Sequence, residues 1–175
     1  YIMAGSGETV SYRELDERSN QGAQLFRYMG LKTGDVIAIL MENHPRFFEI
    51  AWAAQRAGLY FACISSKLTA GEIEYIMKDC EAKVLITSAG VGGVVDELPA
   101  LLPGVKLFMV GQPRAPYESF EAARDAQPAT PIADASAGTD MLYSSGTTGR
   151  PKGIKPPLTG APIDAALARQ LGLVN

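Results

Sequence analysis

Apolar residues follow two arrangements that alternate along this chain: short continuous runs, and longer stretches in which they recur at every third or fourth position. Continuous runs are typical of strands buried on both faces, whereas the second spacing is typical of a helix with one buried face. The pattern predicts strands at residues 36–41, 60–64, 83–87, 105–110 and 140–143. It predicts helices at residues 11–30, 45–57, 69–77, 94–101 and 117–126. This alternation predicts an α/β fold, a parallel sheet flanked by helices.

Local signals support two of these helix starts and one helix end. Ser11 is followed three residues later by Glu14, and Thr69 by Glu72, which is the spacing of a capping box. Gly30 is placed to end the first helix, because glycine adopts the left-handed conformation common after a last turn.

Composition and charge narrow the class of protein. The chain has 175 residues, enough for one hydrophobic core, and 47% of them are hydrophobic against 20% charged, as in a globular protein. Sixteen Lys and Arg against nineteen Asp and Glu give a net charge of -3 without a basic run, so nucleic acid is not an expected partner. No apolar run approaches the ~20 residues of a transmembrane helix. No secretory signal is visible, and we expect a cytoplasmic location.

Several reactive or aromatic side chains have ordinary structural interpretations. The two cysteines, Cys63 and Cys80, are not closely spaced, and we interpret both as reduced packing residues. The single histidine, His44, is interpreted as a loop residue near the start of the second helix. Aromatic residues at helical spacing usually belong to a core, and we assign three of them to it: Phe47, Phe48 and Trp52.

The segment 143–153 carries the chemistry, because it gathers glycines, hydroxyls and cations directly after a predicted strand. Gly146 and Gly149 allow a tight turn whose backbone amides can surround an anion. Lys152 adds a full positive charge, and four hydroxyl groups add hydrogen-bond donors. Pro151 and the spacing from Gly146 exclude a Walker-type loop. The candidate polyphosphate-binding residues are Ser144, Ser145, Gly146, Thr147, Thr148, Gly149 and Lys152.

From Tyr143 to Gly153 the chain closely resembles the Ser/Thr/Gly-rich signature of the adenylate-forming (AMP-binding) enzymes, and residues 42–49 and 67–73 resemble fatty-acyl-CoA ligases. Two departures from the family pattern are visible. Ser144 replaces the usual Thr and keeps the hydroxyl, whereas Pro156 and Pro157 stand where many members have a Ser-His pair.

The resemblance implies that residues 1–175 are part of the large N-terminal domain of an acyl-CoA synthetase, with its phosphate loop at 143–153. Such an enzyme would use ATP, Mg²⁺ and CoA to convert a carboxylic acid, here a fatty acid, to an acyl-adenylate and then a thioester. The rest of that domain, the C-terminal domain, the catalytic lysine and the magnesium-binding acid of the family would lie beyond Asn175. The resemblance therefore assigns no catalytic or metal-binding residue to this chain, and we expect the chain alone to be inactive.

Two other functions remain open at this level. A chain naturally this short would be a non-catalytic nucleotide- or phosphate-binding module, and a different member of the family would activate an amino acid or an aryl acid. We also expect self-association, since a partial domain leaves apolar surface or a sheet edge exposed.

Overall fold

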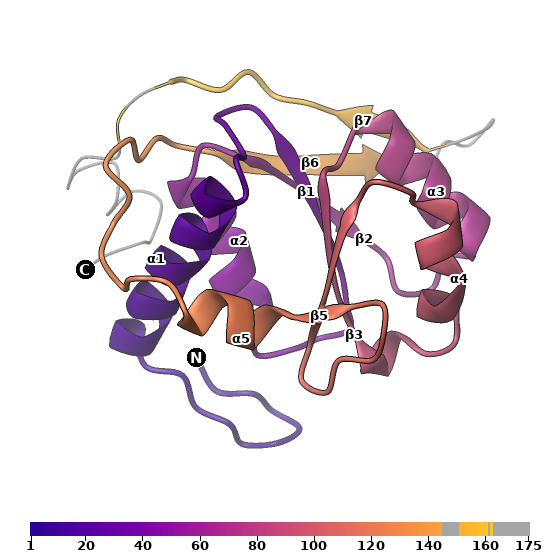
Figure 1. The fold of residues 1–175 in the computed structure, drawn as a ribbon, viewed down its shortest axis with the longest axis horizontal. Helices are drawn as coiled ribbons and strands as arrows, with labels where there is room; N and C mark the ends of the chain where they lie inside the picture. Colours follow the sequence, from indigo (N-terminus) through magenta and orange to yellow (C-terminus); the bar gives the residue numbers. More distant parts are fainter. Residues whose placement is uncertain (145–150, 161, 163–175) are drawn as a thin grey trace.

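The computed structural model describes residues 1–144, 151–160 and 162. Within them a seven-stranded sheet runs in the order β5-β4-β3-β1-β2-β6-β7 (Figure 1). The strands are β1 (Val36–Leu40), β2 (Tyr60–Ile64), β3 (Val84–Ser88), β4 (Lys106–Val110), β5 (Glu118–Ser119), β6 (Thr139–Ser144) and β7 (Lys152–Ile154). All neighbouring pairs are parallel except β6 with β7, which is antiparallel. The predicted parallel sheet is confirmed.

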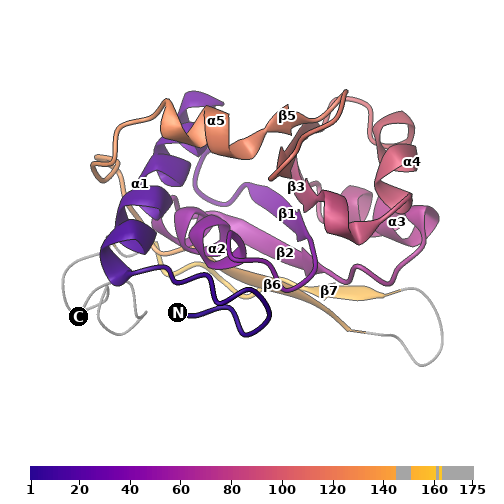
Figure 2. The same ribbon diagram turned by 90° about the horizontal axis from the view of Figure 1, so that it is seen from below.

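Helices cover both faces of this sheet (Figures 1 and 2). Side chains of α1 (Tyr12–Tyr28), α2 (Phe47–Arg56) and α5 (Phe120–Asp125) share one buried cluster with the sheet. Side chains of α3 (Ala70–Asp79) and α4 (Val94–Leu101) form a second cluster with the opposite face. A short 3-10 turn, Ala89–Val91, links β3 to α4. Because β1 is covered on both sides, all five of its residues are buried, as its continuous apolar run predicts.

The predicted helix boundaries have local causes. Both capping boxes are present: the Ser11 hydroxyl accepts a hydrogen bond from the Glu14 amide, and Thr69 and Glu72 make the same pair of contacts at the start of α3. Gly30 follows α1 with a φ of 82°, and its amide donates to the carbonyl of Arg27.

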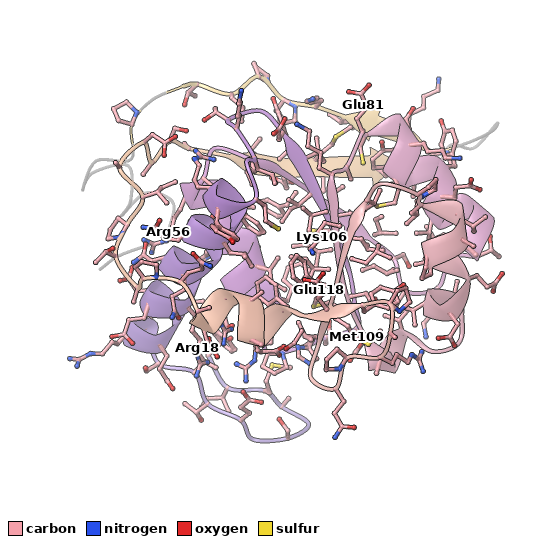
Figure 3. The ribbon with its side chains drawn as sticks, in the orientation of Figure 1. Arg18, Arg56, Glu81, Lys106, Met109 and Glu118 are labelled. Atoms are coloured by element: carbon pink, nitrogen blue, oxygen red, sulfur yellow. The ribbon has the colours of Figure 1, made fainter. Side chains whose placement is uncertain are left out.

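Two short strands were not predicted. β5 occupies the start of the segment predicted as a helix at 117–126, and β7 follows the glycine-rich loop. Strands of two or three residues have no readable periodicity, so only their partners reveal them. Lys106 of β4 and Glu118 of β5 form an ion pair across that edge of the sheet (Figure 3).

Two packing assignments were wrong. Phe48 is 48% exposed and Cys63 is also exposed, although Cys80 is buried as expected. At one point of contact between α1 and α2 the residues are small: a Cβ on Gly22 would lie 2.6 Å from the Cβ of Ala53. A large ring does not fit so close an approach. Of the aromatic residues of α2, Phe47 and Trp52 are half-buried and Phe48 is exposed.

Within the described residues, no helix combines the length and the apolar character that crossing a bilayer requires.

Candidate functional site

The candidate phosphate loop is bounded by two paired strands. β6 enters it and β7 leaves it, with Ser144 directly opposite Lys152 in the antiparallel register. Both residues are exposed. The other five candidates, Ser145, Gly146, Thr147, Thr148 and Gly149, lie outside the described residues. The structure thus describes the two ends of the predicted site.

Strand alternation sorts the hairpin side chains onto two faces. Ser144 and Lys152 share one face with the pair Leu142 and Ile154, because opposite residues of an antiparallel pair project to the same side. A hydroxyl-bearing residue and a lysine therefore start from neighbouring backbone positions, on the same face, at the start and the end of the loop. This is an arrangement suited to an anion.

Tyr143 lies on the opposite face and ties the hairpin to α3. Its hydroxyl donates a hydrogen bond of 2.6 Å to a carboxylate oxygen of Asp79. Desolvation by burial, followed by the hydrogen bond to Asp79, raises the pKa of the Tyr143 hydroxyl. Tyr143 therefore stays protonated, and remains a donor, at neutral pH.

A second contact holds the chain after β7 against the sheet. The hydroxyl of Tyr60 on β2 donates to the carbonyl of Pro156 at 2.6 Å, and the ammonium of Lys155 lies 4.7 Å from the centre of the Tyr60 ring. Pro156, one of the two departures from the family signature, thus contributes a backbone acceptor.

A cavity of about 680 Å³ lies along α3 and reaches Pro151 at the end of the loop. Glu72 and Asp79 of α3 line one side of it, and Pro151, which directly precedes β7, lines another. The open space next to the loop is thus bordered on the α3 side by carboxylates and by one lysine, Lys78.

The other reactive side chains do not form a catalytic site in the described part of the chain. Although Cys63 is exposed, partial desolvation by the surrounding protein and, after it, the carboxylate of Asp140 raise the pKa of its thiol to about 11, so the thiol is protonated at neutral pH. Half-burial lowers the pKa of His44, whose Nδ1 accepts a hydrogen bond from the amide of Arg46. His44 precedes α2 in a loop, and the sequence interpretation of this residue is confirmed.

No group of three or more His, Cys, Asp or Glu side chains in residues 1–144, 151–160 and 162 is arranged to hold a metal ion. We assign no step of a reaction to a metal ion.

Comparison with known proteins agrees with the fold and the signature. The family model described as AMP-binding enzyme matches residues 1–156. A fatty acid–[acyl-carrier-protein] ligase of Streptomyces coeruleorubidus is 30% identical over 85% of this chain and 28% of that protein. A feruloyl-CoA synthase of an Amycolatopsis species is 33% identical over 84% of this chain and 28% of that protein.

A solved structure gives the same result for the fold. The anthranilate CoA ligase AuaEII, in complex with anthranoyl-AMP, superimposes with a TM-score of 0.73 at 28% identity, over 81% of this chain and 28% of that one. The chain thus spans less than a third of the length of these three proteins.

Proposed function

Because this chain belongs to the AMP-binding enzyme family, we propose that it carries the triphosphate-binding loop of a ligase that activates a carboxylic acid with ATP. In the reaction of this family the carboxylate attacks the α-phosphorus of ATP, which gives an acyl-adenylate and pyrophosphate. The thiol of CoA then displaces AMP to form the thioester. ATP, the acid and CoA are the proposed partners, with magnesium accompanying ATP.

The observation that carries the proposal is the pairing of Ser144 with Lys152 across β6 and β7. It brings a hydroxyl donor and a positive charge to the two ends of a segment rich in glycine and hydroxyl residues. We assign them, with Ser145, Gly146, Thr147, Thr148 and Gly149, to binding of the β- and γ-phosphates as pyrophosphate departs. Their contribution is positioning and charge neutralisation, and no proton transfer is assigned to them.

For the acid we propose a fatty acid. Residues 42–49 and 67–73 resemble fatty-acyl-CoA ligases, and one of the relatives is named as a fatty acid ligase. An aryl acid is the second candidate, since the relative at 33% identity is named as a feruloyl-CoA synthase and the matching structure as an anthranilate CoA ligase. Pyrophosphate release by the full-length protein, measured with a long-chain fatty acid, ferulate and anthranilate in parallel, separates the two.

We further propose that residues 1–175 are part of the N-terminal domain of the ligase and are inactive alone. The support is the share of the relatives that the chain spans, less than a third.

The test of the loop is to time the two half-reactions separately in the full-length protein. A charge-assisted hydrogen bond is typically worth about 1.5–3 kcal/mol, so Lys152→Ala should slow adenylate formation by roughly ten- to a hundredfold. Thioester formation from supplied acyl-adenylate should change much less, since the β- and γ-phosphates have already left. Ser145→Ala, which removes a neutral donor, should show the same pattern more mildly.

Lys155→Ala is the matched control, because Lys155 is an exposed lysine three residues away whose ammonium lies over Tyr60. It should leave adenylate formation close to wild type. Equal slowing of both half-reactions by Lys152→Ala, or slowing of the second alone, would refute the loop assignment.

A further inference from the structure

The residues on the far side of the hairpin from Lys152 form a contact that the phosphate chemistry does not require. Tyr143 is the residue before Ser144, and Gly153 is the residue after Lys152; the two are directly opposite in the β6–β7 register. A Cβ on Gly153 would lie 2.6 Å from Cε of Met141 and 2.9 Å from both Cζ and Oη of Tyr143, closer than real Cβ contacts allow. The Tyr143 ring thus lies across Gly153, in space that any other residue would fill.

This placement brings the Tyr143 hydroxyl to α3. Asp79 accepts its hydrogen bond at 2.6 Å, although the two residues are 64 positions apart in the chain. Figure 1 shows α3 beside the ends of β6 and β7. The hairpin is therefore joined to a helix that packs on the core of the sheet, through Ile73 and Met77.

The position of Asp79 points to a role other than stabilising its own helix. Asp79 is the last residue of α3, and a carboxylate at a helix C-terminus opposes the helix dipole. The neighbouring Lys78 pairs instead with Glu74, at 2.6 Å. A carboxylate that is unfavourable for its own helix is expected to take part in a tertiary contact. For Asp79 that contact is the hydrogen bond from the Tyr143 hydroxyl.

We propose that Asp79, Tyr143 and Gly153 are positioning residues that hold Ser144 and Lys152 in place for the terminal phosphates of ATP. The inference rests on the proposed function. The Asp79–Tyr143 hydrogen bond fixes β6, the strand that enters the loop. Gly153 has no side chain and therefore leaves room for the Tyr143 ring, which extends to α3. None of the three touches the phosphates in this scheme, and their effect passes through the orientation of the hairpin.

Comparing the affinities for ATP and for AMP distinguishes a positioning role from a merely structural one. Both nucleotides share the adenosine and the α-phosphate, but only ATP has the β- and γ-phosphates that the loop would bind. Dissociation constants of the full-length protein are to be measured by calorimetry for AMP and for ATP with magnesium, without any acid substrate. Loss of positioning should weaken ATP binding alone.

Two single variants remove the Asp79–Tyr143 hydrogen bond while keeping the aromatic ring at position 143. Tyr143→Phe and Asp79→Ala should each weaken ATP binding by roughly three- to tenfold, the scale of one lost hydrogen bond, with AMP binding unchanged. Combined, they should cost no more than either alone, because each removes the same contact. Asp79→Asn keeps an acceptor oxygen and should restore ATP binding to within about twofold of wild type.

Two further variants complete the set. Gly153→Ala should weaken ATP binding in the wild-type background but much less in Met141→Ala/Tyr143→Ala, where neither the Met141 Cε nor the Tyr143 ring meets the added methyl group. Glu74→Ala, which removes a carboxylate from the same helix, is the matched control and should bind ATP as wild type does.

Lys152→Ala distinguishes the two proposals. If Lys152→Ala weakens ATP but not AMP binding while Tyr143→Phe and Asp79→Ala bind both normally, the positioning inference is wrong and the loop assignment stands. Equal weakening of ATP and AMP by Tyr143→Phe and Asp79→Ala would also overturn the inference, since it indicates a general structural defect. If Lys152→Ala leaves the ratio of ATP to AMP affinity unchanged, the proposed function itself fails.

Discussion

The carboxylate of Glu49 on α2 and the guanidinium of Arg124 on α5 form an ion pair in which both side chains are almost completely buried, with 0% and 6% exposure. Arg18 of α1, labelled in Figure 3, and Arg46 each donate to the other carboxylate oxygen at 2.9 Å. One buried negative charge is therefore shared by three arginines that come from different parts of the chain.

Glu49→Gln should destabilise the fold strongly. The substitution keeps the shape but removes the charge that compensates the arginines, and breaking a buried ion pair in this way typically costs about 3–5 kcal/mol. Urea unfolding of the chain measures the loss. Glu74→Gln is the control, because Glu74 pairs with the exposed Lys78 and such surface pairs contribute about 0–1 kcal/mol. Similar losses for both variants would show that the buried cluster is not a stabilising centre.

Gly138→Ala should also destabilise the chain, for a steric reason. A Cβ at Gly138 would lie 2.2 Å from the carbonyl oxygen of Leu59 and 2.9 Å from that of Ala54, and backbone atoms cannot rotate away as a side chain can. We expect a cost of about 1–3 kcal/mol, the usual range for overpacking. At Gly71 in α3 the added methyl group meets nothing within 4 Å, so Gly71→Ala should be neutral or stabilising by up to about 1 kcal/mol. Thermal unfolding of both variants tests the contrast.

Alkaline pH should weaken the fold through Tyr117. Its hydroxyl donates to the carbonyl of Val95 at 2.6 Å, and burial, followed by the charge of Asp96, raises the pKa of Tyr117 to about 12. Above pH 10 the unfolded chain loses this proton while the folded chain keeps it, so the free energy of unfolding falls from pH 10 towards 12. In Tyr117→Phe that part of the pH dependence should vanish. Urea titrations measure this free energy at each pH. If it falls between pH 10 and 12 as steeply in Tyr117→Phe as in the wild type, the assignment is wrong.

The chain should self-associate through its hairpin. Leu142 and Ile154 are cross-strand neighbours and are 55% and 57% exposed, on the last two strands of the sheet order. An exposed apolar pair beside a sheet edge favours pairing with a second copy. Light scattering at rising concentration should show dimers or larger species, and the double variant Leu142→Ser/Ile154→Ser should shift them towards monomer. Tyr28→Ser, which removes an exposed ring from α1, should not. A wild-type monomer at all concentrations would refute this prediction.

The elements that are determined by residues close together in the sequence were predictable. The capping boxes at Ser11 and Thr69 each close within four residues, and the strands β1 and β2 follow from continuous apolar runs. These signals are local because the hydrogen bonds and burial that cause them repeat with the period of the helix or strand. The parallel sheet follows from the order in which they alternate.

The candidate site was predictable as a segment and not as an arrangement. The order of residues from Tyr143 to Gly153 carries the family signature, so the loop could be named before any fold was known. Nothing in it indicates that Ser144 and Lys152 are directly opposite, because β7 is too short to show a pattern and its register comes from β6.

The sequence by itself thus determined which segments become the helices and the longer strands, and which loop has the composition to bind phosphate. Only the tertiary structure decided that Phe48 and Cys63 are exposed, that three arginines meet at Glu49, and that Tyr143 reaches Asp79. The physical reason is that those outcomes depend on which surfaces lie a few ångströms apart after the chain has folded. That separation is set by the packing of helices on the sheet, and no local periodicity contains it.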